Sequence, residues 1–110
     1  MPAEEKSFVE CNEWIKQNTP PDAIVLSRKP YYTELMAGRK SVGYLNSEDP
    51  AAQLDHIVAN GAGYIIAGDL KFYIHEKEQL INTVNRYKEK FTLLYTTKSV
   101  PEDYVYRVSD

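Results

Sequence analysis

The sequence predicts a doubly wound α/β domain, with helices on both faces of a mostly parallel sheet of about five strands and an antiparallel hairpin at the C-terminal edge. Two short, continuously apolar runs, 23–27 and 63–67, are typical of strands covered on both faces. Helical patterns alternate with the strands up to residue 87, and such alternation requires crossover connections and parallel pairing. Only residues 97–103 join the last two strands, which is too short for a helical crossover, so these two strands should pair antiparallel.

The first predicted helix covers residues 7–17. Ser7 and Glu10 have the spacing of a capping box, in which each side chain accepts from a backbone N–H at the start of a helix. Cys11 lies at a core spacing from Phe8 and Ile15, so the only cysteine of the chain should be buried. Residues 18–22, which contain two prolines, end the helix.

The middle of the chain contains two further helices between short strands. A helix over 30–37 should begin with Pro30 and end at Gly38, and a strand should follow over 41–44. The next helix should take Asp49 as its N-cap, continue from Pro50, and end at residues 60–61. Its inward-facing stripe is predicted to be Ala51, Leu54, Ile57 and Val58.

The C-terminal part should turn at residues 68–69 and enter a fourth helix over 73–87. The inward-facing side chains of that helix are predicted to be Ile74, Ile81, Val84 and Tyr87. Strands over 91–96 and 104–108 complete the sheet. We see no linker or repeat, so the chain is expected to form a single domain over residues 1–110.

Composition and charge exclude several classes of function. The net charge is −3 and the basic residues are scattered, which argues against a nucleic-acid partner. A single cysteine allows neither an internal disulfide nor a thiolate metal cluster, and we expect no cofactor. No apolar run approaches the ~20 residues that span a bilayer.

The candidate binding residues lie where the predicted strands end, because ligands of open α/β sheets lie beyond the carboxyl ends of the strands. Arg28 and Lys29 precede a helix N-terminus, where backbone N–H groups favour a phosphate or sugar phosphate; the alternative is a solvated loop whose cations meet nearby acids. Tyr31 and Tyr32 cannot both face the core of one helix. The tentative substrate-binding set is Ser27, Arg28, Lys29, Tyr31, Tyr32 and Tyr44.

The sequence shows no catalytic residues. The glycines at 61 and 63 precede a strand, whereas a dinucleotide-binding loop follows one and opens a helix. Neither His56 nor His75 has a second His or Cys at the spacing of a metal site. No nucleophile lies in a recognisable arrangement with a base, which argues against an independent hydrolase.

The segment 13–30 resembles the C-terminal soluble region of multi-spanning membrane glycosyltransferases related to the protein mannosyltransferases and the aminoarabinose transferases. In those proteins a helix with a tryptophan, here Trp14, leads into a turn and strand like residues 19–30. Similar segments follow at 38–44, at Asp49-Pro50 and at 61–66, and the resemblance covers roughly residues 8–108.

The resemblance implies that the chain is excised from a larger membrane protein that transfers a sugar from a polyprenyl-phosphate donor. The domain would then be a non-catalytic accessory part on the extracytoplasmic face of the membrane, covering or helping to form the donor or acceptor site. Its partners would be the transmembrane portion of the same polypeptide and the lipid-linked sugar or its acceptor. The alternative is a free-standing cytosolic α/β module that binds a nucleotide or a partner protein.

Overall fold

The structure is a computed structural model that describes residues 3–68 and 74–109. The elements in chain order are α1 (Ala3–Asn18), β1 (Ile24–Leu26), α2 (Pro30–Ala37), β2 (Lys40–Val42), α3 (Pro50–Ala59), β3 (Tyr64–Ala67), α4 (Ile74–Arg86), the 3-10 helix η1 (Lys88–Lys90), β4 (Phe91–Thr96) and β5 (Tyr104–Val108).

The strands form one five-stranded sheet in the order β2-β1-β3-β5-β4, which confirms the predicted α/β fold. Strand β1 pairs parallel with both β2 and β3. Strand β5 pairs antiparallel with β3 on one side and with β4 on the other, and the β4–β5 ladder has a register irregularity between Leu93 and Tyr95. The C-terminal hairpin therefore forms as predicted, with β4 at the edge and β5 inside the sheet.

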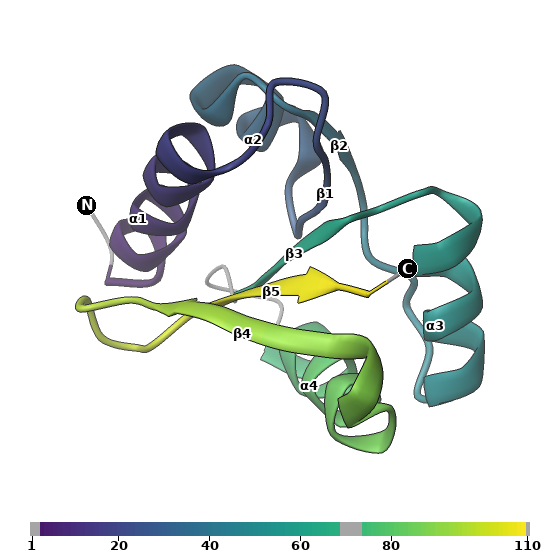
Figure 1. The fold of residues 1–110 in the computed structure, drawn as a ribbon. Helices are drawn as coiled ribbons and strands as arrows, with labels where there is room; N and C mark the ends of the chain where they lie inside the picture. The colour runs from purple at the N-terminus through teal and green to yellow at the C-terminus, as the bar shows by residue number, and fades with distance from the viewer. Residues whose placement is uncertain (1–2, 69–73, 110) are drawn as a thin grey trace.

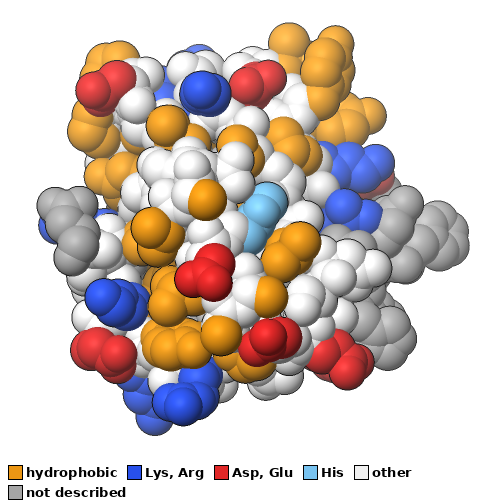
Figure 2. All heavy atoms as spheres, turned by 90° about the vertical axis from the view of Figure 1, so that its right-hand side faces the viewer, with side chains coloured by type: hydrophobic (Ala, Val, Ile, Leu, Met, Phe, Trp, Pro, Cys, Tyr) orange, Lys and Arg blue, Asp and Glu red, His pale blue; other side chains and the backbone are white. Residues whose placement is uncertain are grey.

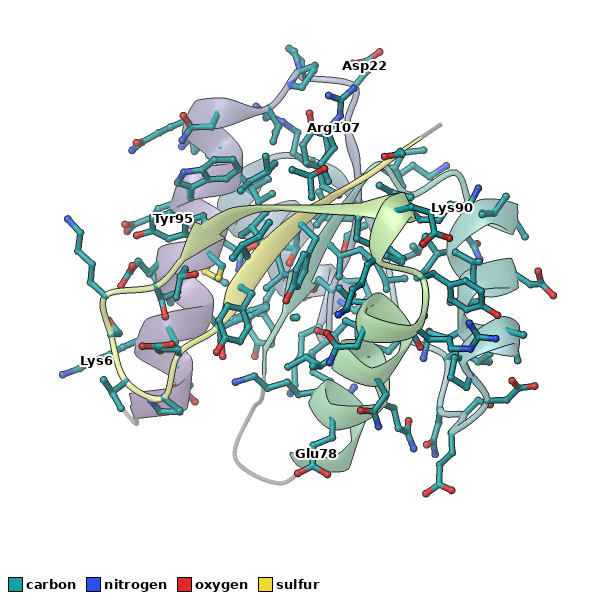
Figure 3. All side chains as sticks on the ribbon, turned by 60° about the horizontal axis from the view of Figure 1, so that its bottom comes forward. Lys6, Asp22, Glu78, Lys90, Tyr95 and Arg107 are labelled. Atoms are coloured by element: carbon teal, nitrogen blue, oxygen red, sulfur yellow. The ribbon has the colours of Figure 1, made fainter. Side chains whose placement is uncertain are left out.

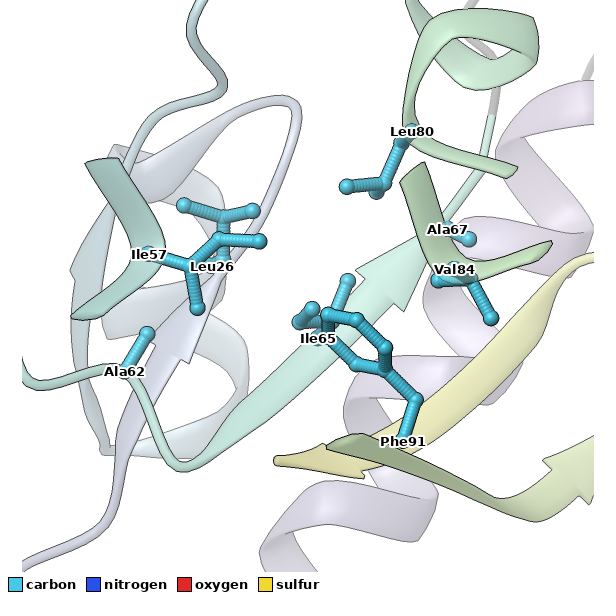
Figure 4. Close-up of a cluster of buried hydrophobic side chains, with 8 residues drawn as sticks. All are labelled: Leu26, Ile57, Ala62, Ile65, Ala67, Leu80, Val84 and Phe91. Atoms are coloured by element: carbon cyan, nitrogen blue, oxygen red, sulfur yellow. The ribbon is translucent and has the colours of Figure 1, made fainter. Parts of the chain in front are cut away.

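The helices cover the two faces of the sheet in pairs, as Figure 1 shows. On one face, α1 and α2 pack on a cluster that contains Cys11 and Val25. On the other face, α3 and α4 pack on a larger cluster, drawn in Figure 4, that contains Leu26 and Ile65. Successive residues Val25 and Leu26 are both fully buried on opposite faces, because strand side chains alternate. This explains the continuously apolar run.

Local sequence signals set the bounds of α2 and α3 as predicted. Pro30 is the first residue of α2, and Gly38 ends this helix in the left-handed conformation with φ 65°. Asp49 is the N-cap of α3, and its carboxylate accepts from the N–H of Ala51 at 3.0 Å. These caps depend on neighbouring residues only, so the sequence is enough to place them.

The predicted capping box at Ser7 and Glu10 is wrong. Helix α1 begins at Ala3, so both residues lie inside it, where the backbone N–H groups already have partners in the helix. The Ser7 hydroxyl instead donates to the carbonyl of Pro101 at 2.5 Å. The Glu10 carboxylate accepts from the hydroxyl of Tyr95, which lies on β4 beside α1 in Figure 3. Both side chains therefore hold the β4–β5 loop against α1.

The predicted inward stripe of α3 is half wrong. Ile57 is fully buried and Leu54 packs against the core, but Ala51 is exposed and Val58 is 64% exposed. Gln53 is buried in their place. Its amide donates to the carbonyl of Leu45 at 2.7 Å and accepts from the N–H of the same residue at 3.1 Å, so its polar atoms are satisfied inside. An apolar pattern cannot reveal a polar side chain that is buried by pairing with a loop.

Helix α4 forms close to its predicted range. Val84 is buried, and Ile81 and Tyr87 pack against the core. The predicted turn residue Asp69, the predicted first residue Tyr73 and the side chain of Ile74 lie outside the described residues.

The surface that includes α3 is mixed in character. Figure 2 shows hydrophobic side chains in small groups separated by charged ones of both signs. In the part of the chain that the structure describes, none of the helices is both long and apolar enough to cross a bilayer.

Candidate functional site

The sheet order places a topological switch point between β1 and β3. From β1 the chain crosses through α2 to β2 on one side, and from β2 it crosses through α3 to β3 on the other side. Helices α2 and α3 cover opposite faces of the sheet, so the strand order reverses direction at β1. Open α/β sheets bind ligands beyond the carboxyl ends of the strands at such a point. Most of the candidate residues lie at or beside this edge.

Ser27 belongs to the framework of this edge. The residue is fully buried, and its hydroxyl oxygen accepts from the Thr33 hydroxyl at 2.8 Å and from the N–H of Lys29 at 3.2 Å. The N–H of Ser27 donates to the carbonyl of Val42 at 2.9 Å. Ser27 thus fixes the first turn of α2 to the end of β1.

At the N-terminus of α2, some of the backbone N–H groups that could bind an anion already donate hydrogen bonds within the chain. Lys29 is the N-cap and makes no side-chain cap hydrogen bond, and Pro30, the first helical residue, has no N–H. The N–H groups of Tyr32 and Thr33 donate to the carbonyl of Lys29 at 3.1 and 3.2 Å. An anion at this end would therefore depend mainly on the side chains of Lys29 and of Arg28, which is half-buried.

Tyr44 connects the end of β2 to the end of β3. Its hydroxyl donates to the carbonyl of Ile66 and accepts from the N–H of Gly68 at 3.1 Å. Its ring packs against the cluster beneath α3 and α4, whereas α2 covers the opposite face of the sheet. The structure therefore separates Tyr44 from the tyrosines of α2.

Lys29, Tyr31 and Tyr32 lie together on the outside of α2. The two rings meet edge to face, with centroids 6.0 Å apart, and the Lys29 Nζ lies 5.5 Å from the centroid of Tyr32. Both tyrosines are exposed, which agrees with the expectation that adjacent positions of one helix cannot both face the core and goes beyond it. Leu35, one turn further on, is exposed too. We call the exposed residues Tyr31, Tyr32 and Leu35, together with Lys29, the α2 surface.

A groove of about 270 Å³ lies beside the α2 surface, between α1 and α2. Its apolar walls and its charged rim are lined by Glu5, Phe8, Val9, Lys29, Tyr32 and Met36. An aromatic ring and a cation at the edge of an apolar groove are suited to binding a ligand that has both an apolar and a polar part.

A buried carboxylate lies at the same edge of the sheet, where β5 begins beside the end of β3. Asp103 is fully buried, and its Oδ1 lies 3.2 Å from the Lys77 Nζ. A Cβ at position 68 would collide with this carboxylate, so the contact requires Gly68. Sequence reasoning missed the pair because its members are 26 residues apart. The one local feature in the sequence that could have indicated this pair is the position of Asp103 directly before β5.

The described side chains show no catalytic arrangement. No group of three His, Cys, Asp or Glu residues within the described part of the chain is placed to hold a metal ion. Burial raises the pKa of the Cys11 thiol, which lies in the core, so that the thiolate is disfavoured. His56 lies 2.8 Å from the carbonyl of Gly43 through Nε2, and the side chain of His75 lies outside the described residues.

A comparison with known protein families found no family that matches this sequence, and a comparison with curated proteins found no match either.

Proposed function

We propose that this chain is a non-catalytic accessory domain of a membrane glycosyltransferase that uses a polyprenyl-phosphate-linked sugar donor. The domain would cover, or help to form, the donor or acceptor site on the extracytoplasmic face of the membrane. The observation that supports this best is the α2 surface, which has two exposed tyrosines and the half-buried Lys29 beside a groove. Tyrosine rings stack on sugars, and a lysine binds phosphate as a point charge.

The resemblance to the glycosyltransferase tail rests on residues that have architectural roles here. Trp14 stacks on Tyr95 with ring centroids 5.7 Å apart, and Asp49 caps α3. The hydroxyl of Thr19 donates to the carbonyl of Ile15 at 2.6 Å at the end of α1. The resemblance therefore supports a shared framework, and function must come from surface residues such as Lys29.

The first test is the size and location of the native protein. An antibody raised against this domain should detect, in fractionated source cells, a membrane-bound band several times heavier than the 12.6 kDa of this chain. A soluble band of 12.6 kDa would contradict the proposal.

The second test measures sugar transfer by the membrane-bound protein. Replacing both Arg28 and Lys29 by alanine should lower transfer about ten- to 150-fold, because a hydrogen bond to a charged group contributes about 1.5–3 kcal/mol. Lys90→Ala is the matched control, since it removes an exposed cation from η1, away from α2. Equal activity of the double variant and the control would rule out a role for these cations.

The second candidate function is a free-standing α/β module that binds a nucleotide. The switch point between β1 and β3 favours it, because this is where doubly wound sheets bind nucleotides. A thermal-shift screen of the chain with nucleoside phosphates would test it. Stabilisation by a nucleotide, together with a soluble native band, would favour this candidate over the first.

A further inference from the structure

The turn between α3 and β3 contains the only Asn-Gly pair of the sequence, Asn60-Gly61. Asn60 is exposed and is the C-cap of α3, and Gly61 has the left-handed conformation with φ 65°. Asparagine loses ammonia spontaneously when the backbone nitrogen of the next residue attacks its side-chain amide. Because glycine has no side chain, nothing at position 61 hinders the approach of that nitrogen. The pair is therefore the most reactive asparagine of the unfolded chain.

This reaction needs only water and a base. The base removes the amide proton of Gly61, and the nitrogen attacks Cγ of Asn60, so that a new C–N bond closes a cyclic imide. The bond between Cγ and Nδ2 breaks, and Nδ2 leaves as ammonia with the proton that the base returns. Water then opens the imide at either carbonyl, which leaves aspartate or isoaspartate at position 60.

The backbone of the folded turn blocks the attack. Asn60 has ψ 0°, so the Gly61 nitrogen eclipses the backbone nitrogen of Asn60 and points away from the side chain. The ring cannot close until this bond rotates. The N–H of Gly61 also donates to the carbonyl of Val58 at 3.0 Å, so the nucleophile is engaged in a hydrogen bond. The N–H of Ala62 donates to the carbonyl of Ile57 at 3.2 Å and holds the next peptide group against α3.

The leaving group is held in the folded turn as well. Nδ2 of Asn60 donates to the carbonyl of His56 at 2.8 Å and lies 3.3 Å from Nδ1 of the His56 ring. Nε2 of His56 lies 2.8 Å from the carbonyl of Gly43, which can only accept, so Nε2 carries the proton and Nδ1 accepts from Asn60. Both reacting groups are therefore tied to α3 while the turn is folded.

We propose that Asn60 is a deamidation site that is protected by the folded turn and reacts when residues 60–63 open locally. The product cannot restore the native turn. An aspartate has no N–H to donate to the His56 carbonyl, and its charge lies at the negative end of the α3 dipole. An isoaspartate adds a backbone atom before Gly61, although the N–H of Gly63 must reach the carbonyl of Ile24 on β1 at 3.0 Å. The modification should therefore loosen the junction between α3 and the sheet irreversibly. The inference is independent of the proposed function, since α3 and the α2 surface lie on opposite faces of the sheet.

The first test is incubation of the 110-residue chain in mildly alkaline buffer, followed by peptide mass spectrometry. In guanidinium chloride that unfolds the chain, Asn60 should deamidate at least tenfold faster than Asn46, which is followed by a serine. Without denaturant, Asn60 should react at least tenfold more slowly than in denaturant. Equal rates for Asn60 and Asn46 in denaturant would overturn the site. Equal rates for Asn60 with and without denaturant would overturn the protection by the turn.

Matched variants test the gating. Ile57 is fully buried, whereas its neighbour Val58 is 64% exposed. Ile57→Ala should accelerate the deamidation of Asn60 in the folded chain at least tenfold, because the lost core volume raises the open population of the turn. Val58→Ala should leave the rate within a few-fold, and in denaturant both variants should react like the unaltered chain. Equal rates for the two variants without denaturant would overturn the gating.

The consequence of the modification is tested with Asn60→Asp, which has the composition of one product. This substitution should lower the urea midpoint of unfolding, because the new charge opposes the helix dipole and a donor to the His56 carbonyl is lost. Asn46→Asp is the control, since it makes the same change at an exposed position before α3. It should not lower the midpoint. An Asn60→Asp variant as stable as the unaltered chain would overturn the loosening of the turn.

Discussion

At the scale of single residues, Glu10 makes four hydrogen bonds to a distant part of the chain, residues 95–99. Its carboxylate accepts from the N–H of Lys98 at 2.7 Å, from the N–H and hydroxyl of Ser99 at 3.1 and 2.9 Å, and from the Tyr95 hydroxyl. Burial by itself would raise the pKa of Glu10, but these hydrogen bonds outweigh it and lower the pKa to about 2. The bond to Glu10 in turn raises the pKa of Tyr95 to about 12.

Replacing Glu10 by glutamine should destabilise the domain by about 1–3 kcal/mol near neutral pH, because the new amide group places donors against N–H donors. The folded pKa lies below the unfolded value of about 4.5, so the stability that the carboxylate contributes is present above that pH. It is lost as the pH falls toward about 2, where the native residue is protonated and resembles the variant. Urea unfolding across this range measures the difference.

Glu13→Gln is the control for this prediction, since Glu13 lies on the same helix but is exposed. It should change the free energy of unfolding little at any pH. A Glu10 variant that is as stable as the Glu13 variant at neutral pH would show that the carboxylate contacts do not contribute.

At the scale of secondary-structure elements, Arg39 joins the ends of α1 and α2. Its Nη2 donates to the carbonyls of Lys16 and Thr19 at 3.0 and 2.9 Å, and its Nη1 donates to the carbonyl of Ala37 at 3.0 Å. The last carbonyls of a helix have no partner within it, so a cation at this position satisfies them and opposes the negative end of the helix dipole. Arg39 is thus a shared C-terminal cap for two helices.

Substituting lysine for Arg39 should cost about 1–3 kcal/mol of unfolding free energy, because a single ammonium group cannot replace a planar fork that reaches several carbonyls. The substitution should also accelerate amide hydrogen exchange, and the acceleration should be larger at the end of α1 than in the strands. Lys40→Arg provides the comparison, since Lys40 is the exposed neighbour on β2. If exchange at α1 were unchanged in the Arg39 variant, the capping role would be refuted.

Elements whose limits depend on adjacent residues were predictable from the sequence, and long-range polar contacts were not. Pro30, Gly38 and Asp49 act through their own turns, and the structure confirms their positions. The partners of Glu10 lie 85 or more residues away in the sequence. A local pattern cannot show such partners, and for this reason the sequence pattern predicts a capping residue at Glu10.

The candidate site shows the same limit. The adjacent positions of Tyr31 and Tyr32 in a helix predicted that the two rings do not both face the core, but the exposure of both rings is a result of the fold. The buried pair of Lys77 and Asp103 depends on the fold, because only the pairing of β3 with β5 places Asp103 beside Gly68.

At the scale of the whole molecule, the sheet couples two separate clusters of core side chains. Cys11 lies in the cluster beneath α1 and α2, and Ile65 lies in the cluster beneath α3 and α4. Neighbouring residues of β1 and β3 belong to opposite clusters, as Val25 and Leu26 do. The two faces should therefore unfold together as one cooperative unit.

Ile65→Ala should accelerate the labelling of Cys11 by a thiol reagent, although the two residues lie on opposite faces. The lost volume should cost about 2–5 kcal/mol, which raises the open population about 30-fold to several-thousand-fold. Val58→Ala, at an exposed position, should leave the labelling rate within a few-fold of the unaltered chain. Equal labelling rates for the two variants would mean that the faces open independently.

The position of β5 has a consequence for synthesis on the ribosome. Among the described elements this strand comes after β4 in the sequence, yet it lies between β3 and β4 in the sheet. Strand β4 therefore has no partner until residues 104–108 have left the ribosome, and the contacts of Glu10 with residues 95–99 must wait nearly as long. The nascent chain can form its helices early, but it can close its sheet only when translation of this segment is complete.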